Sequence, residues 1–302
     1  MKSSPQYGIS TDRLTKFYGK QRGVENISFN VELGEVVGFV GPNGSGKTTV
    51  MRMLLNLIHI SSGNAQILGN DITASSVKIR NSIGYLPGTL GLYKNLRVGE
   101  YLRFLAEMRG GNFDSRIYEL SERLALNLTS EIQGLSKGTR QKVGVVQAFM
   151  HSPQVLILDE PTSGLDPIVQ HEFESILSES RESGAAILLS SHVMHEVESL
   201  ASRVAIVSKG HLVLIDNLQK LRESMVHNLK MTFTHPVSGE KFSQCVGVKE
   251  VRLHGFTVEC LTVGSQLEVL ALAVQHGVVS VESEAPSMED IFINATASKD
   301  VS

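Results

Sequence analysis

The sequence predicts an α/β fold built on a mostly parallel sheet. Short apolar runs alternate with helical stretches through the first two thirds of the chain, a pattern typical of strands buried on both faces. The clearest runs are residues 36–40, 155–158, 186–189 and 204–207. Polar residues directly follow the first three, and ligands of such sheets bind beyond the carboxyl ends of the strands. We therefore expect a ligand site at this edge of the sheet.

The first run leads into a glycine-rich loop, GPNGSGKT, at residues 41–48. It has the complete pattern G-x-x-x-x-G-K-[ST] and precedes a predicted helix over residues 49–59, as a phosphate-binding loop must. Glycines let backbone N–H groups converge on phosphate oxygens, and the helix N-terminus adds a positive dipole end. Lys47 is expected to reach the β and γ phosphates and to take part in catalysis, and Thr48 to ligate magnesium. The alternative is a glycine-rich turn without a ligand.

The loop therefore predicts a P-loop NTPase core with ATP and Mg²⁺ as cofactors. The residues expected to contact the nucleotide here are Gly41, Pro42, Asn43, Gly44, Ser45, Gly46, Lys47, Thr48 and Thr49.

Two acidic residues, Asp159 and Glu160, follow the second apolar run. Neighbours on an extended chain point in opposite directions, so one carboxylate can hold the metal while the other faces the attacking water. Asp159 is the expected magnesium ligand and Glu160 the expected general base. His192 ends the third run and could hydrogen-bond the γ-phosphate or the water. The alternatives are a solvated acidic turn and a structural histidine, and the upstream phosphate loop disfavours both.

The rest of the chain has a different spacing of apolar residues. Residues 98–109 and 115–126 carry helix-spaced apolar residues, which predicts a helical subdomain over about residues 90–150. Residues 211–228 indicate a strand followed by a charged helix. We therefore expect a first domain over residues 8–220 and a small α+β domain over residues 225–302.

In that second domain, strands are predicted at residues 229–235, 250–255, 256–263 and 278–281, with His254-Gly255 as a tight turn. Helices are predicted at residues 265–276 and 287–294, the latter with a capping-box start at Ser287 and Asp290. The chain has no internal repeat, so one nucleotide-binding unit is expected.

Composition narrows the function classes. The 302 residues are 41% hydrophobic and 20% charged, with a formal net charge of −3, so no overall basic field favours nucleic acid. Two cysteines are too few for a disulfide framework. No run approaches the roughly 20 apolar residues of a membrane helix, and the first ten residues lack a signal-peptide core. We expect a soluble protein that meets a membrane only through a partner.

Five ordered motifs resemble those of ATP-binding-cassette (ABC) ATPases. Residues 135–141, LSKGTRQ, are similar to the family's signature motif LSGGQ. Residues 159–166, DEPTSGLD, match its Walker B motif and D-loop, and Ser191-His192 matches its switch histidine. Tyr18 matches its adenine-stacking aromatic residue. With the phosphate loop, the resemblance covers about residues 8–220.

The resemblance implies a mechanism. Two such domains would face each other head to tail, with ATP between the phosphate loop of one and Ser136 to Gly138 of the other. Asp166 of the D-loop is expected at the same interface. It also implies an antiparallel β region at the N-terminus, and a cytoplasmic location on the inner face of the membrane through a permease.

The implied partners are a second copy or a paralogous ATPase subunit, and an integral-membrane permease that contacts residues 89–105. The signature variant and the C-terminal tail resemble ATPase subunits of multidrug-efflux or ABC-2-type exporters of drug-like or lipid-like substrates. The C-terminal domain is expected to stabilise the dimer or to regulate it.

Besides Lys137 and Thr139 in the signature, one departure from the family pattern bears on the metal site. Residues 83–87, IGYLP, precede Gly88, where the family usually has glutamine. Glycine offers no side chain to ligate magnesium, so we expect hydrolysis with weaker metal coupling, water filling the position.

Two other function classes stay open from the residues alone. A soluble ABC-type ATPase acting on ribosomes or DNA usually has two cassettes or a long insertion, and this chain has neither. A small-molecule kinase would not need the motif at residues 135–139.

Overall fold

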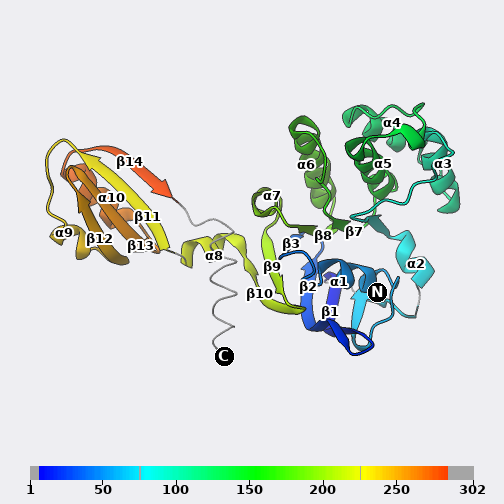
Figure 1. The fold of residues 1–302 in the computed structure, drawn as a ribbon, viewed down its shortest axis with the longest axis horizontal. Coiled ribbons are helices and arrows are strands. Elements are labelled where there is room, and N and C mark those ends of the chain that lie inside the picture. Colours follow the sequence, from blue (N-terminus) through cyan, green and yellow to red (C-terminus); the bar gives the residue numbers. More distant parts are fainter. Residues whose placement is uncertain (1–6, 75, 225, 285–302) are drawn as a thin grey trace. The chain divides into compact units, whose positions relative to one another are not determined.

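The computed structural model describes residues 7–74, 76–224 and 226–284 (Figure 1). The chain divides into two compact units, Met1–Ile215 and Asp216–Ser302, and each is described by itself. The functional division expected from the sequence, residues 8–220 and 225–302, stays a prediction. None of the helices in the described part has the length and apolarity that a membrane span requires.

A six-stranded sheet forms the centre of the first unit, in the order β10-β9-β3-β8-β7-β6. The four predicted strands are confirmed as β3 (Val36–Val40), β7 (Val155–Asp159), β8 (Ala186–Ser191) and β9 (Arg203–Ser208), and they are joined by β6 (Ile83–Leu86) and β10 (His211–Asn217). Strands β9, β3, β8, β7 and β6 pair in parallel. Every residue of β3, β7 and β8 is buried, which explains their continuous apolar runs.

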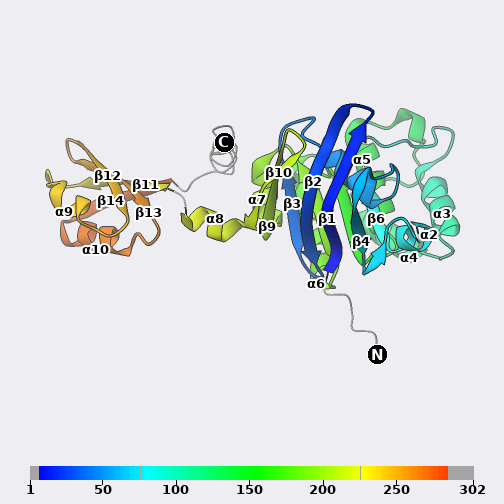
Figure 2. The ribbon, with the colours of Figure 1, turned by 90° about the horizontal axis from the view of Figure 1, so that it is seen from below.

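A second sheet is antiparallel and N-terminal, as the resemblance implied. It contains β1 (Tyr7–Tyr18), β2 (Gln21–Glu32), β4 (Ser62–Ile67) and β5 (Asn70–Asp71) in the order β2-β1-β4-β5. Figure 2 shows β1 and β2 side by side, and they pair along most of their length. One buried apolar cluster joins this sheet, α1 and the parallel sheet, and it includes Ile9, Phe39 and Met51.

Helices connect the parallel strands. They are α1 (Lys47–Leu54), α2 (Ser76–Asn81), α3 (Val98–Met108), α4 (Asp114–Arg123), α5 (Lys137–Phe149), α6 (Pro167–Glu182) and α7 (Met194–Leu200), with a 3-10 turn η1 (Ile132–Gly134). The predicted helix 49–59 is shorter than expected, because Asn56 has a left-handed φ of 51°. Likewise α4 ends before residue 126, because Ala125 has a φ of 47°.

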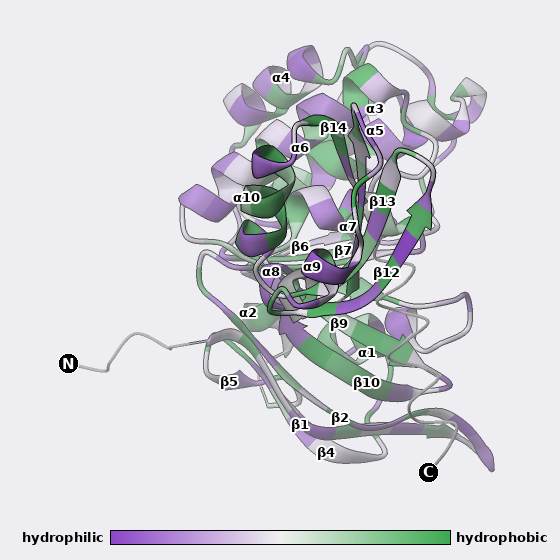
Figure 3. Ribbon diagram, turned by 90° about the vertical axis from the view of Figure 1, so that its left-hand side faces the viewer, coloured by the Kyte–Doolittle hydropathy of each residue, from purple (hydrophilic) through white to green (hydrophobic). Residues whose placement is uncertain are grey.

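The predicted helical subdomain consists of α3, α4 and α5. In Figure 3 the ribbon of α4 is largely hydrophilic, in keeping with its solvent-facing position. Arg123 of α4 ties this subdomain to α6, since its guanidinium contacts Glu172 at 2.5 Å and Glu179 at 2.7 Å. These contacts raise the pKa of Arg123, so the guanidinium stays charged at any physiological pH.

The second unit has the split βαβ arrangement, which the sequence did not predict. Its strands are β11 (Val226–Phe233), β12 (Val248–His254), β13 (Thr257–Val263) and β14 (Val278–Glu284), antiparallel in the order β12-β13-β11-β14. Helices α9 (Glu240–Ser243) and α10 (Leu267–Gln275) follow β11 and β13, and α8 (Leu218–Ser224) precedes them. A core of eight buried residues, centred on Phe242, makes this unit compact.

Two sequence expectations in this unit change. The tight turn lies at Gly255-Phe256 instead of His254-Gly255, because His254 pairs with Thr257 and Gly255 takes the left-handed φ of 64°. The predicted helix 287–294, with Ser287 and Asp290, lies outside the described residues.

His151, just after α5, gives the first unit a pH-dependent stability. Burial lowers its pKa from 6.5 to about 4, and the nearby Arg109 charge acts in the same direction. The folded protein therefore keeps His151 neutral while the unfolded chain protonates it. Its contribution is complete above about pH 6.5 and is lost as the pH falls toward 4.

We predict that His151→Gln flattens the fall of the free energy of unfolding between pH 6.5 and 4, measured by urea denaturation. The matched control is His171→Gln, because the His171 side chain is 88% exposed. If both variants kept the wild-type slope, the burial of His151 would not affect stability.

Candidate nucleotide site

The loop between β3 and α1 forms the floor of the site. Gly46 has a φ of 112°, and a Cβ there would lie 2.3 Å from a methyl group of Val24. A Cβ at Gly41 would lie 2.1 Å from the carbonyl oxygen of Val207. Both positions therefore require glycine, which brings the loop backbone close to its neighbours.

Lys47 begins α1 and is 6% exposed. Its ammonium donates to the carbonyl oxygens of Gly41 at 2.5 Å and Pro42 at 3.3 Å. Burial lowers the pKa of Lys47, while the charges of Glu160 and Asp159 oppose that shift. A cation held by neutral carbonyls beside an open cavity is ready to exchange them for an anion.

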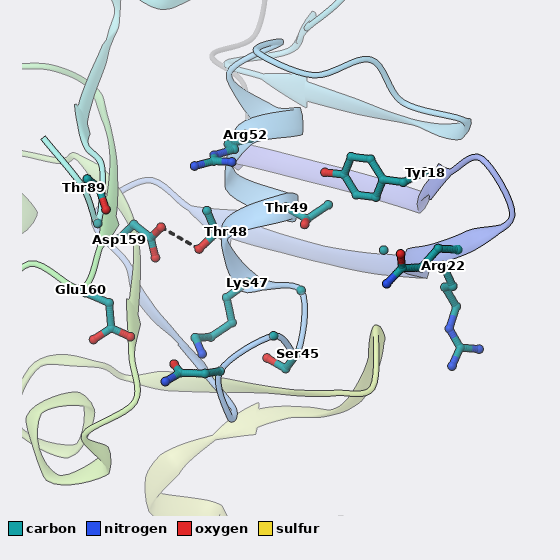
Figure 4. A pocket seen from close by; sticks show the side chains of 16 residues that line it. Tyr18, Arg22, Ser45, Lys47, Thr48, Thr49, Arg52, Thr89, Asp159 and Glu160 are labelled. Atoms are coloured by element: carbon teal, nitrogen blue, oxygen red, sulfur yellow. Dashed lines mark hydrogen bonds between the residues drawn. The ribbon is translucent and has the colours of Figure 1, made fainter. Parts of the chain in front are cut away.

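Asp159, at the end of β7, joins three elements. Its Oδ2 accepts from the Thr48 hydroxyl of α1 at 2.8 Å, and its Oδ1 accepts from the Ser190 hydroxyl of β8 at 2.5 Å. Figure 4 shows the first of these bonds at the edge of the cavity. Asp159 is 4% exposed, and the two hydrogen bonds hold its buried carboxylate oxygens in fixed directions.

Glu160 points away from Asp159, as expected from the sequence, although it lies just past the end of β7 and is not extended (Figure 4). Its backbone has a φ of 53°, uncommon for a residue with a Cβ and often found at functional sites. The Glu160 amide donates to the Ser190 carbonyl at 3.1 Å and holds this conformation. The Glu160 carboxylate lies 2.6 Å from Nδ1 of His192, so the structure brings these two predicted residues together.

A cavity of about 530 Å³ adjoins these residues. It is lined by the phosphate loop as well as by Asp159 and Glu160. Tyr18, which is 49% exposed, lines the end away from Asp159 (Figure 4). Ten of the residues predicted for the site line this cavity, namely Tyr18, Asn43, Gly44, Ser45, Gly46, Lys47, Thr48, Thr49, Asp159 and Glu160. Gly41 and Pro42 contribute carbonyls to Lys47 from below.

Sequence reasoning missed five lining residues, which are Gln21, Arg22, Gly23, Arg52 and Thr89. Arg52 was within reach of the sequence, because it follows Thr48 by four positions on α1 and therefore shares its helix face. Gln21, Arg22 and Gly23 begin β2 and Thr89 follows β6, and no motif signals that these segments approach the cavity.

Besides Gly41, Pro42 and His192, three predicted residues do not line this cavity. Ser136 caps α5, accepting from the Thr139 amide at 3.1 Å, and Asp166 caps α6, accepting from the Val169 amide at 3.0 Å. Gly138 packs on the loop after β7, where a Cβ would lie 2.4 Å from the Gly164 carbonyl oxygen.

Gly88 adjoins the Asp159 carboxylate. A Cβ built at Gly88 would lie 3.4 Å from Asp159 Oδ2, which is ordinary contact, and Gly88 lines the cavity. A longer side chain at this position would enter the space beside Thr48 and Asp159.

The residues present fit a magnesium nucleotide. The Ser45 hydroxyl is 3% exposed, and none of the described residues supplies it with a hydrogen-bond partner. A phosphate oxygen would satisfy it. In the described ranges no cluster of three or more His, Cys, Asp or Glu could hold a metal alone. Thr48 and Asp159 would be the residues that hold a magnesium ion together with phosphate oxygens, ligands that magnesium commonly takes.

Comparisons with known proteins agree with this geometry. A family model described as "ABC transporter" matches residues 24–163. The bacitracin transport ATP-binding protein of Bacillus licheniformis is 34% identical over 294 residues, 94% of this chain and 96% of its own. Its counterpart in Enterococcus faecalis is 35% identical over 257 residues, 84% of this chain and 82% of its own.

Among solved structures, an ATP binding subunit of an ABC transporter superposes with a TM-score of 0.68 at 31% identity, covering 71% of this chain and 91% of that one. The fold carries a phosphate loop, with Asp159 and Glu160 at the same edge of the sheet, and the relatives are similar along most of the chain. The protein therefore belongs to the ABC transporter family as an ATP-binding, ATP-hydrolysing member.

Proposed function

We propose that the residues around the cavity bind and hydrolyse MgATP in the roles that their geometry supports. Lys47 exchanges its carbonyl partners for β- and γ-phosphate oxygens, and the amides of residues 43–49 surround the phosphates. The Tyr18 ring lies where an adenine can stack on it. The observation that carries this assignment is the Thr48–Asp159 hydrogen bond, which joins the two expected magnesium ligands at 2.8 Å.

Hydrolysis also needs a general base that faces the water attacking the γ-phosphate. Glu160 faces the cavity and can take a proton from the attacking water, while His192 at 2.6 Å holds the carboxylate in place. Bound magnesium would neutralise charge on the phosphates.

The remaining predicted residues support action in trans. Ser136 and Gly138 lie outside the cavity, at the start of α5, where a hydroxyl and free amides can bind a γ-phosphate held by a second cassette. Asp166, in the adjoining loop, is assigned to the same interface. Because no motif of this chain is degenerate apart from Gly88, a homodimer with two competent sites is our preferred assembly.

We further infer that a separate membrane permease is the partner, and that the pair exports a drug-like or lipid-like substrate from a cytoplasmic ATPase face. An apolar depression of about 670 Å³ is lined by Tyr93, Lys94, Asn95, Leu96 and Phe104, inside the segment 89–105 expected to contact the permease. Tyr93 is 60% exposed and Phe104 40% exposed, and their rings stack edge to face at 5.9 Å. Exposed aromatic groups of this kind are typical of docking surfaces.

The first prediction concerns Glu160→Gln. Without a base this variant should bind ATP but hydrolyse it at least about 100-fold more slowly, the usual contribution of a general base. It should therefore shift from monomer to dimer in size-exclusion chromatography only when MgATP is present. The control is Glu160→Gln combined with Lys47→Ala, which should stay monomeric because the phosphate contact is lost.

Normal turnover by purified Glu160→Gln would rule out the base assignment. A monomer both with and without MgATP would instead point to a paralogous cassette or to assembly on the permease.

The second prediction concerns Gly88→Gln. An amide oxygen beside Asp159 should lower the magnesium concentration for half-maximal ATPase activity by roughly tenfold, the scale of a group that supports a metal ligand. Gly91→Gln is the matched control, since Gly91 has open space around it and does not line the cavity. An unchanged magnesium dependence in Gly88→Gln would show that this position does not influence the metal.

The third prediction concerns the permease contact. Phe104→Asp should place a charge in the apolar depression and release the protein from the membrane fraction of cells that also express the permease. Tyr118→Asp on α4, where the side chain is 55% exposed, is the control. Full retention of Phe104→Asp on membranes, together with an unchanged melting temperature, would exclude this surface.

A further inference from the structure

The loop that follows Glu160 contacts both the signature helix and the segment of His192. This loop, residues 160–166, is closed by the Ser163 amide on the Glu160 carbonyl at 3.2 Å and by the Leu165 amide on the Thr162 carbonyl at 3.0 Å. Short turns of this kind hold their own shape but need outside contacts to fix their position.

On one flank, the start of α5 holds the loop. The Gln141 side-chain amide donates to the carbonyls of Glu160 at 3.1 Å and Pro161 at 2.8 Å. The Lys137 stem covers Gly164, where an added Cβ would lie 3.3 Å from Lys137 Cδ. The Lys137 ammonium donates to the Ser163 hydroxyl at 2.9 Å.

On the other flank, Glu196 of α7 holds the loop. Its Oε2 accepts from the Thr162 hydroxyl at 2.5 Å and from the Ser191 hydroxyl at 2.9 Å. The loop is thus fixed between the signature helix and the residue that precedes His192.

Helix stability does not account for Lys137. It occupies the first position of α5, where the helix dipole disfavours a cation. Across the described ranges no carboxylate lies within ion-pair distance of its ammonium, and ordering an exposed lysine stem costs side-chain conformational entropy. The hydrogen bond from Lys137 to Ser163 therefore points to a role other than stabilising α5.

We propose that Lys137 is a positioning residue that ties the signature segment to the loop at residues 163–164, so that Ser136 and the loop after Glu160 meet the partner cassette as one rigid surface. This rests on the proposed dimeric ATPase. Lys137 stands where the signature motif usually has glycine, so this tie belongs to chains that carry a long cation there.

The test is a double-mutant cycle on steady-state ATP hydrolysis. Lys137→Met keeps the stem without the ammonium, and Ser163→Ala removes the acceptor. Each should lower kcat about tenfold with KM for ATP unchanged, because neither residue lines the cavity. The double variant should be no slower than either single variant, and Lys137→Arg should restore kcat. Lys142→Met, on the same helix, is the control.

Three results would overturn the proposal. These are additive losses in the double variant, a raised KM in Lys137→Met with Ser163→Ala unaffected, which would mean direct contact with nucleotide, or a wild-type kcat in Lys137→Met.

A second measurement does not depend on turnover. Hydrogen exchange of the Ser163 and Leu165 amides in the nucleotide-free protein should become faster in Lys137→Met but not in Lys137→Arg. Unchanged exchange would contradict the tie. A wild-type protein without ATPase activity would refute the proposed function while leaving this measurement to decide on Lys137.

Discussion

The buried carboxylate of Asp159 is the constraint on which the site depends. A group of this kind is costly to bury unless its oxygens are hydrogen-bonded, and here each accepts from a hydroxyl on a different element, Thr48 on α1 and Ser190 on β8. The phosphate loop, β7 and β8 must therefore end at one level of the sheet. The parallel pairing of β3, β8 and β7 supplies that level, because it aligns the three strand ends.

The position of Asp159 also fixes its neighbour. Asp159 turns its carboxylate toward Thr48, and the left-handed φ of Glu160 accompanies a carboxylate that lies against His192 instead. Strain of about 1–3 kcal/mol persists only where surrounding contacts impose it. Here they include the Ser190 carbonyl, which accepts from the Glu160 amide, and the Gln141 side chain, which donates to the Glu160 carbonyl. Two adjacent carboxylates thus acquire separate environments.

Much of this arrangement was predictable from the sequence, because it depends on local signals. The buried strands follow from continuous apolar runs, and the loop from its glycines and Lys47. Other features depend on long-range packing. The early end of α1 follows from one left-handed residue, Asn56, which no pattern announces. The order of β11 to β14 is set by register between distant strands. The approach of Arg22, in β2, and of Thr89, after β6, to the cavity depends on how these segments pack in the rest of the fold.

The departures from the family pattern, Gly88 and Lys137, contact two different features at the end of β7: Gly88 adjoins the Asp159 carboxylate, and Lys137 contacts the loop after Glu160. Gly88 has no side chain beside the Asp159 carboxylate, whereas Lys137 places one against the loop that follows Glu160. Under the proposed function, the first change would weaken a direct link between the helical subdomain and the metal. The second would strengthen a link between that subdomain, through α5, and the loop. In the proposed dimer, closure of two cassettes would move the subdomain and Glu160 together, and in this chain the hydrogen bonds of Lys137 and Gln141 to the loop connect the two.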